Sequence, residues 1–237
     1  MPRALKEWLW TDYPSVSSTN DIAKNYKTGN KEEKVLITAE EQVKGRGRRG
    51  RTWISAKGNL FMSLLFSTKV SPSDIAFVTS LSIAQTLKKA DNHLNVNIKW
   101  PNDILINGKK VSGILIEVGE SGIVVGIGIN LVSSPAQSET IYTATNLKDE
   151  GIDISRENFL EKMLDVFADN LKKCEISGLQ AIREDWLNFA YNLHNSISIR
   201  QGNNFQSGIF MGIDEQGFLL LKQQNKIEKI SVGDIIE

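Results

Sequence analysis

Nearly continuous apolar runs of strand length recur in the first half of the chain. They cover residues 59–67 and 122–132, and a third run over 34–42 is apolar except at its charged end. Runs of this length without helical spacing are typical of strands buried on both faces. The pattern therefore predicts three strands, of which 59–67 is a buried one.

Two long segments instead space their apolar residues as helices do. Residues 71–90 begin with Ser-Pro, and residues 155–175 begin at Ser155, so each has a start signal before its apolar face. We also expect a helix over roughly 178–190 and a short one that follows Ser18 and ends at Gly29. Strands and helices interleaved in this way indicate an α+β fold.

Residues 96–118 contain two β-rich runs joined at Asn107-Gly108. Asn-Gly is the strongest short hairpin signal, because a type I′ turn needs positive φ at both central positions. Pro101 cannot donate to a sheet ladder, so we expect the first run to break, or to lie at a sheet edge, at that residue.

The pattern changes near residue 195. From there to the end the chain contains only short strand-like runs separated by glycines. This is typical of a small β-barrel or sandwich. We therefore expect a larger α+β domain over residues 1–192 and a small β domain over 193–237.

The composition excludes several classes of protein. Lys plus Arg and Asp plus Glu are both 28, so the net charge is zero, whereas a nucleic-acid-binding domain is usually basic. Cys174 is the only cysteine, and the two histidines are His93 and His194, which argues against disulfides and zinc sites. With no signal-peptide or membrane-length apolar run in this sequence, the expected location is the cytoplasm, away from membranes.

One segment departs from this neutral background. Residues 44–53, KGRGRRGRTW, place four arginines between three glycines. Arginine matches carboxylates and phosphates, and glycine gives the backbone freedom, so an anion could order a loop that repulsion keeps open when it is empty. A solvated surface loop and a nucleic-acid contact are the alternatives, although Trp53 indicates that the loop is tethered near a core.

Three further segments carry candidate chemistry. In KWPND (99–103), Lys99 could pair with a phosphate and Asp103 could hold Mg²⁺; a surface salt bridge is the alternative. Lys110 precedes an apolar run and could contact an anion, or it could be a solvated edge lysine. In GIGIN (126–130), the glycines could let a ligand approach the backbone or mark a bulge, and Asn130 needs a polar partner.

No arrangement for covalent catalysis is evident. The sequence has no Ser-His-Asp or Cys-His pattern and no GxxxxGK[ST] loop. The glycines of 45–50 fit GxGxxG, but no helical pattern follows, so a dinucleotide-binding fold is not supported.

Taken in order, these segments resemble the biotin–protein ligases, also called biotin–[acetyl-CoA-carboxylase] ligases. The resemblance covers roughly residues 10–190, and the C-terminal β region also fits. The matching segments are SSTN (17–20), EQVKGRGRRGRTW (41–53), KWPNDI (99–104), KKVSGILIE (109–117) and GIGIN (126–130).

This resemblance implies a mixed-sheet catalytic domain of the class II aminoacyl-tRNA synthetase-like type with a small SH3-like β-barrel after it. It also implies biotin and ATP as substrates, Mg²⁺ as cofactor, biotinyl-5′-AMP as intermediate and a lysine of a biotin carboxyl carrier protein as acceptor. A homodimer is left open. SSTN begins at residue 17, so we expect a ligase without the DNA-binding domain of some relatives, and no DNA partner.

The resemblance also assigns residues. Lys110, Arg48 and Lys99 are the expected catalytic residues, and Arg49 and Arg51 are expected to position the loop. Asp103 is the expected Mg²⁺ ligand. The expected biotin-binding residues are Ser18, Thr19, Asn20, Gln42, Arg46, Gly47, Arg48, Lys110 and Gly113. The expected nucleotide-binding residues are Arg46, Arg48, Trp53, Lys99, Asn102 and Asn130.

Two alternatives stay open at this point. A lipoate- or octanoate-transferring relative would share the catalytic fold, although such proteins generally lack the GRGRRG segment. A nucleic-acid-binding module would use the arginine loop and would bind bare nucleic acid in a salt-dependent manner.

Overall fold

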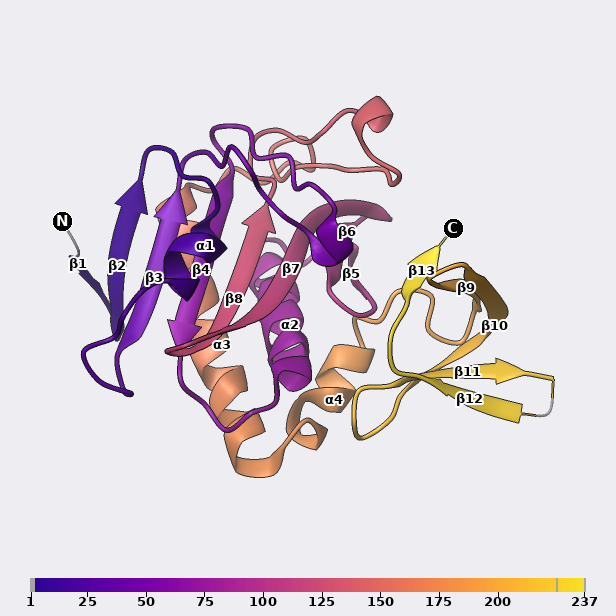
Figure 1. Cartoon of the computed structure of the whole chain (residues 1–237). Helices are drawn as coiled ribbons and strands as arrows, with labels where there is room; N and C mark the ends of the chain where they lie inside the picture. Colours follow the sequence, from indigo (N-terminus) through magenta and orange to yellow (C-terminus); the bar gives the residue numbers. More distant parts are fainter. Residues whose placement is uncertain (1–2, 225, 237) are drawn as a thin grey trace.

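The computed structural model describes residues 3–224 and 226–236. Its main element is an eight-stranded mixed sheet with the order β1-β2-β3-β4-β8-β7-β6-β5 (Figure 1). Only the β2–β3 pair of this sheet is parallel. The strands are β1 (Arg3–Leu5), β2 (Trp8–Tyr13), β3 (Lys34–Ala39), β4 (Leu60–Phe66), β5 (Val96–Lys99), β6 (Asp103–Ile106), β7 (Lys109–Gly119) and β8 (Gly122–Ile129).

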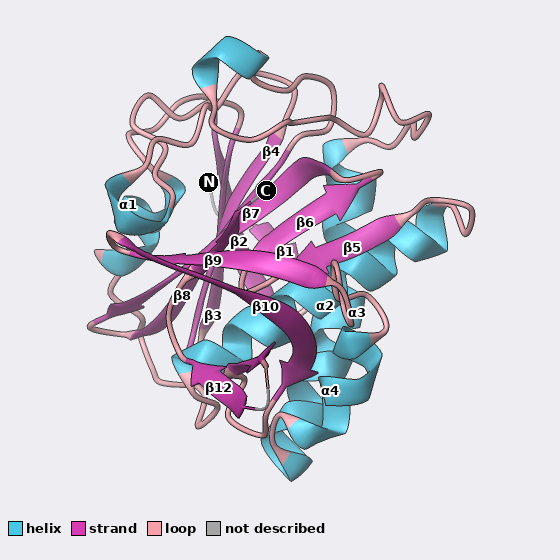
Figure 2. Ribbon diagram, turned by 90° about the vertical axis from the view of Figure 1, so that its right-hand side faces the viewer, coloured by secondary structure: helices cyan, strands magenta, loops and turns pink. Residues whose placement is uncertain are grey.

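Three helices cover one face of this sheet. They are α2 (Pro72–Ala90), α3 (Arg156–Ser177) and α4 (Gln180–Leu187), and Figure 2 shows them together on one side. Along β8, Ile123, Val125, Ile127 and Ile129 join the core beneath these helices. Because strand side chains alternate between faces, the residues between them lie on the opposite face. Ser71 and Ser155 cap α2 and α3 as predicted.

The opposite face is covered only in part. The short helix α1 (Thr19–Lys24) connects parallel strands β2 and β3, and Ala23 packs there against Val35, Ile37 and Leu65. The predicted end at Gly29 is wrong: the helix ends at Lys24 with Asn25 as its C-cap, and the Asn25 side-chain amide donates to the Asp21 carbonyl at 2.9 Å. Beyond α1, the face stays open over β7 and β8.

The predicted hairpin is confirmed between β6 and β7. Asn107 and Gly108 have φ values of 51° and 75°, as a type I′ turn requires. The strand before it breaks at Pro101, as predicted, and its first part, β5, is the edge strand of the sheet. The Trp100–Pro101 peptide is cis.

A five-stranded antiparallel sheet follows, and all of its strands lie within the predicted segment 193–237. Its order is β12-β11-β10-β9-β13. Its apolar side chains join the core of the large sheet, and the Trp100 indole donates to the Gly217 carbonyl at 3.2 Å. None of the described helices is long and apolar enough to cross a membrane. The strands are β9 (Ser196–Gln201), β10 (Asn204–Ile213), β11 (Leu219–Gln223), β12 (Lys226–Ile230) and β13 (Asp234–Ile236).

Candidate active site

The open face of the large sheet holds a cavity of about 450 Å³. Its floor is formed by β7 and β8, and α1 closes one end. The arginine loop crosses in front of these strands toward β13, where it contributes another wall (Figure 1). A connecting segment over residues 139–142 completes the lining.

Glycines make the floor flat enough for other side chains to rest on it. A Cβ on Gly126 would lie 2.3 Å from Asn20 Oδ1, and one on Gly128 would lie 2.4 Å from Trp53 Nε1. A Cβ on Gly113 would lie 2.9 Å from the Trp53 ring. The GIGIN glycines thus admit two protein side chains that line the cavity, and a larger residue would displace them.

The end of the cavity nearest α1 is a polar network. Gln42 Oε1 accepts from the Thr19 backbone N–H at 2.8 Å and from its hydroxyl at 3.1 Å. The Ser63 hydroxyl donates to Asn20 Oδ1 at 2.6 Å, and Gln42 Nε2 donates to Ser55 Oγ at 3.1 Å. Buried polar groups bound in this way keep fixed orientations, so this end presents an ordered set of donors and acceptors.

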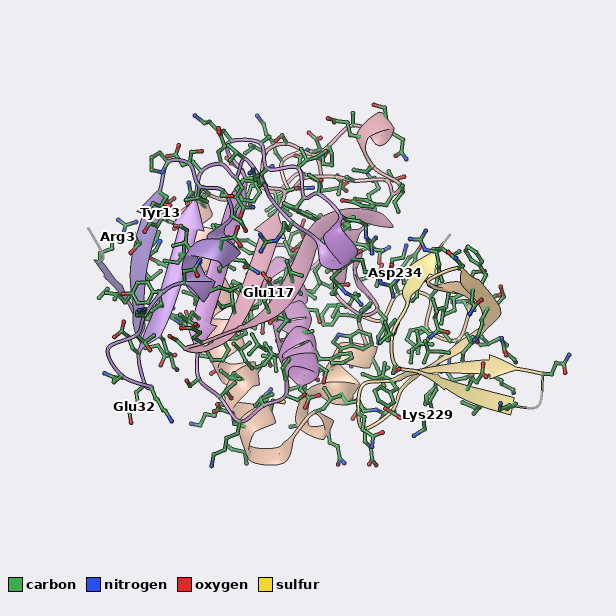
Figure 3. All side chains as sticks on the ribbon, in the orientation of Figure 1. Arg3, Tyr13, Glu32, Glu117, Lys229 and Asp234 are labelled. Carbon is green, nitrogen blue, oxygen red and sulfur yellow. The ribbon has the colours of Figure 1, made fainter. Side chains whose placement is uncertain are left out.

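Glu117 fixes the outer side of this network. It projects from β7 beside α1 (Figure 3) and accepts from Asn20 Nδ2 at 2.8 Å, Lys24 at 3.1 Å and Arg46 at 3.2 Å. Burial alone would raise the pKa of Glu117, but the hydrogen bonds from Asn20 and Lys24, together with Arg46, lower it. Arg46 also pairs with Asp21, so two carboxylates hold the first arginine of the loop.

Lys110 dominates the other end. Its ammonium lies 2.7 Å from Asp103 Oδ1, and its side chain is only 12% exposed. It lies 4.6 Å from the Tyr142 ring centroid and 5.4 Å from that of Trp53, so two aromatic faces flank it. Burial, with the nearby Asp103 charge, raises the pKa of Tyr142 to about 12, which keeps its phenol protonated.

The arginine loop is closed over this end. A backbone bridge between Arg46 and Thr52 joins the two arms of the loop. Arg49 and Gly50, which both have positive φ, form its turn. Arg48 donates to Asn102 Oδ1 at 2.9 Å. Burial lowers the pKa of Arg48, and the Asp234 carboxylate partly opposes this. In this structure the loop does not lie open, as repulsion alone would have it, because carboxylates offset part of the charge of its arginines.

Comparison with known proteins identifies the family. A model described as the biotin/lipoate A/B protein ligase family matches residues 13–132, and one described as the biotin protein ligase C-terminal domain matches residues 196–236. The chain belongs to the biotin/lipoate A/B protein ligase family. Within the family, it resembles the biotin protein ligases.

Curated and solved relatives agree with this assignment. The biotin–[acetyl-CoA-carboxylase] ligase of Paracoccus denitrificans is 36% identical over 78% of this chain and 83% of its own length. The bifunctional ligase/repressor BirA of Bacillus subtilis is 32% identical over 93% of this chain and 71% of its own. The structure of the Aquifex aeolicus biotin protein ligase in complex with biotin and ATP has a TM-score of 0.85, 28% identity and 98% coverage of both chains.

Most of the residues predicted for this ligase-family site line the cavity, but two lie elsewhere. Lys99 is on β5, opposite Asp103 in the ladder, and neither it nor Asn130 belongs to the lining found among the described residues. Asn130 is buried; its amide donates to the Thr145 carbonyl at 3.0 Å, and its Oδ1 has no protein partner within the described chain. The predicted residues in the lining are Ser18, Thr19, Asn20, Gln42, Arg46, Gly47, Arg48, Trp53, Asn102, Asp103, Lys110 and Gly113.

The sequence analysis missed several residues of this site. Arg51 lines the cavity as well as positioning the loop, and Tyr142 and Asp234 were not singled out at all. Tyr142 lies in a segment without periodicity, and Asp234 is one acidic residue in a short strand, so neither carries a local signal. Glu117 lay within a quoted segment, KKVSGILIE, and a charge on a buried strand could have marked it.

Asp103 faces the cavity, whereas the part of the chain that the structure describes contains no cluster of three or more His, Cys, Asp or Glu residues able to hold a metal. Mg²⁺ commonly binds through one or two carboxylates together with substrate phosphates. The donor set therefore fits a cation that arrives with a phosphate ligand better than one held by the protein alone.

Proposed function

We propose that the protein is an ATP-dependent biotin–[acetyl-CoA-carboxylase] ligase. The supporting observation is one cavity with a polar hydrogen-bonding end beside Asn20 and a cationic end at Lys110 and Arg48. Relatives of this chain are named for that activity, and the similar Aquifex aeolicus ligase binds biotin and ATP.

In the first step, a biotin carboxylate oxygen forms a bond to the α-phosphorus of ATP. The bond from that phosphorus to the bridging oxygen breaks, and pyrophosphate leaves with the electron pair. Two anions must approach each other, so cations directed at the reacting phosphate offset their repulsion. Lys110 and Arg48 supply these charges, and the flanking rings of Tyr142 and Trp53 limit where the Lys110 ammonium can lie.

The polar end favours biotin over lipoate. A ureido ring offers two N–H donors and one carbonyl acceptor, whereas a dithiolane ring offers neither strong donors nor strong acceptors. Asn20 and Gln42 line this end of the cavity, and covering them with a dithiolane would cost free energy, because water would leave these polar side chains without a new hydrogen bond in return.

In the second step, the uncharged amine of a carrier lysine attacks the carbonyl carbon of the mixed anhydride. The bond from that carbon to the phosphate oxygen breaks, AMP leaves, and the nitrogen loses a proton. The acceptor is a biotin carboxyl carrier protein, as the relatives' names suggest. The closed arginine loop would shield the anhydride from water until the carrier arrives.

Mg²⁺ would bind through Asp103 and the phosphates of ATP, where it would neutralise charge on the triphosphate. Asp103 pairs with Lys110, so this carboxylate can exchange one cationic partner for another. Asn102, the neighbouring residue, holds Arg48 at the same end of the cavity.

The arginines are poorly placed for nucleic acid. Arg46 is bound by Asp21 and Glu117, and the other three arginines of the loop meet Asp234. A loop whose arginines already contact carboxylates and are partly buried releases fewer counterions than a free basic loop, which weakens the main driving force for binding nucleic acid.

Pyrophosphate release separates the alternatives. We expect release with biotin and MgATP, no release with lipoate or octanoate and MgATP, and transfer of biotin to a purified carrier domain. Release with lipoate alone would contradict the proposal. Salt-dependent binding of bare RNA or DNA, without pyrophosphate release, would support the nucleic-acid alternative.

A further inference from the structure

Asp234 contacts four arginines, of which three belong to the arginine loop and the fourth, Arg200, to β9. Its carboxylate lies 2.8 Å from Arg51, 3.1 Å from Arg49, 3.7 Å from Arg48 and 3.9 Å from Arg200. The carboxylate side chain is only 14% exposed. Figure 3 shows it on β13, at the border between the small sheet and the arginine loop.

The backbone around Asp234 is fixed by the small sheet. β13 pairs with β9, and Asp234 lies directly opposite Arg200 in that ladder. β9 in turn pairs with β10, and the small sheet shares its core with the large sheet. The carboxylate therefore has a rigid base, whereas the loop that meets it is rich in glycine.

Four guanidinium groups around one carboxylate leave positive charge uncompensated. Asp234 and two of these arginines, Arg48 and Arg51, line the cavity. A carboxylate here can hold the loop in place while the cluster still attracts phosphate, because the four positive charges exceed its single negative charge. A neutral residue would leave the arginines repelling one another.

We propose that Asp234 is a positioning residue, which holds the arginine loop closed over the site from the C-terminal sheet and leaves excess positive charge for the anionic substrate. The role in catalysis rests on the proposed function, but the closure itself does not. The C-terminal sheet thereby takes part in the site through one carboxylate.

Trypsin tests the closure in the empty protein, since it cleaves after arginine and the loop contains four arginines. We expect Asp234→Asn to be cut within residues 46–51 about five to ten times faster than the parent protein, because ion pairs no longer oppose loop opening. Mass spectrometry locates the cuts, and thermal unfolding reports the stability of each variant.

Asp214→Asn is the matched control. Asp214 is also a nearly buried carboxylate that contacts the small sheet, with a side chain 11% exposed, but its partner is Lys229. We expect trypsin to cut the arginine loop of the Asp214→Asn variant at the same rate as that of the parent protein. Equal acceleration in both variants, or no acceleration in Asp234→Asn, would overturn the proposal.

Arg49→Gln and Asp234→Glu keep the test usable if Asp234→Asn does not fold. Arg49 contacts Asp234 without lining the cavity, so its loss should speed cleavage about twofold and leave the small sheet intact. Asp234→Glu retains the charge and should stay within about twofold of the parent. Parent-like cleavage in Arg49→Gln together with rapid cleavage in Asp234→Glu would overturn the proposal.

Retention of the adenylate then links closure to function. After reaction with biotin and MgATP, we expect biotinyl-5′-AMP to leave Asp234→Asn about five to ten times faster than the parent or Asp214→Asn, by the same loss of loop contacts. Equal rates would overturn the positioning role. If the parent forms no adenylate but trypsin still distinguishes the variants, the proposed function fails and the closure stands.

Discussion

The floor of the cavity and the loop over it are held by different forces. The floor is made of paired strands, and its glycines and Lys110 keep their places through sheet register and a continuous core. The loop is held by ion pairs to Asp21, Glu117 and Asp234, which belong to three other elements. Strand pairing and core burial resist opening, whereas partly exposed ion pairs add little each.

The difference assigns different tasks to the two regions. A rigid floor suits the placement of reacting groups, because small displacements of a catalytic charge cost much of its effect. A loop closed by exchangeable ion pairs suits admission and retention of charged ligands, because a phosphate can replace a carboxylate as partner. Changes in the floor should therefore act on chemistry, and changes in the loop on ligand release.

The largest effect should come from the floor. Lys110→Ala removes the cation between Asp103, Trp53 and Tyr142, and we expect single-turnover adenylate synthesis to slow by about 10²–10³-fold. Lys109→Ala removes the neighbouring lysine, which pairs with Glu150, and should cost less than about threefold. Normal adenylate synthesis in Lys110→Ala would contradict the assignment of the chemical step to the floor.

Two glycine substitutions should separate the part of the floor that binds biotin from the part that binds ATP. Gly126→Ala drives a methyl group into Asn20, and overpacking of this kind should raise the KM for biotin about tenfold or more. Gly128→Ala instead displaces Trp53, so we expect it to act mainly on the KM for ATP. Steady-state kinetics with each substrate varied decide this, and equal effects of both variants on both substrates would contradict it.

The sequence predicts the floor better than the loop. The floor depends on local sequence patterns, whereas the loop is held by ion pairs between residues far apart in the chain. Apolar runs and Asn107-Gly108 fix strands and turns within a few residues, so β6, β7 and β8 are confirmed, and Asp103, Lys110 and Gly113 on them line the cavity. The ion pair between Arg51 and Asp234 joins residues far apart in the chain. A single carboxylate in a short strand has no periodicity, and nothing local indicates which arginine it will meet.

Short-range reasoning also fails at the ends of elements and where the chain changes direction. The helix that follows Ser18 ends at Lys24, with Asn25 as its C-cap, and does not reach Gly29. Lys99 belongs to a segment with three charged or amide residues, but it lies outside the cavity lining among the described residues, whereas Asn102 and Asp103 lie in it. The break at Pro101 separates Lys99 on β5 from these two, and the sequence alone does not say which side faces a ligand.

A loop substitution should act on ligand release, and at Arg48, which also supplies charge to the first chemical step, this effect adds to a slower adenylate synthesis. Arg48→Gly removes the guanidinium that lines the cavity and binds Asn102. We expect the adenylate to dissociate about tenfold faster, because a charged hydrogen bond is lost. Arg49→Gly is the control, since Arg49 is outside the lining found in the described residues; it loses only its contact with Asp234, and we expect at most about twofold faster dissociation. Rapid dilution measures the rate at which the adenylate dissociates. An unchanged rate in Arg48→Gly would contradict the assignment of ligand release to the loop.

The smallest effect should appear where loop and floor meet, at Glu117. Its pKa is lowered in the folded protein, because hydrogen bonds from Asn20 and Lys24, together with the charge of Arg46, outweigh the burial that would raise it. The stability it contributes is therefore present above the ordinary pKa of 4.5 and is lost as the pH falls through the lower folded value. Glu117→Gln should be less stable by about 1 kcal/mol at pH 6, and the deficit should shrink toward pH 3.

Urea unfolding at several pH values measures this deficit. Glu120→Gln alters an exposed glutamate in the turn after β7, and it should differ little from the parent protein at any pH. A deficit in Glu117→Gln that stays constant from pH 6 to pH 3 would mean that the carboxylate charge contributes nothing at this junction. The first arginine of the loop would then be held by Asp21 alone, and the loop would be tied to the floor less firmly than to β13.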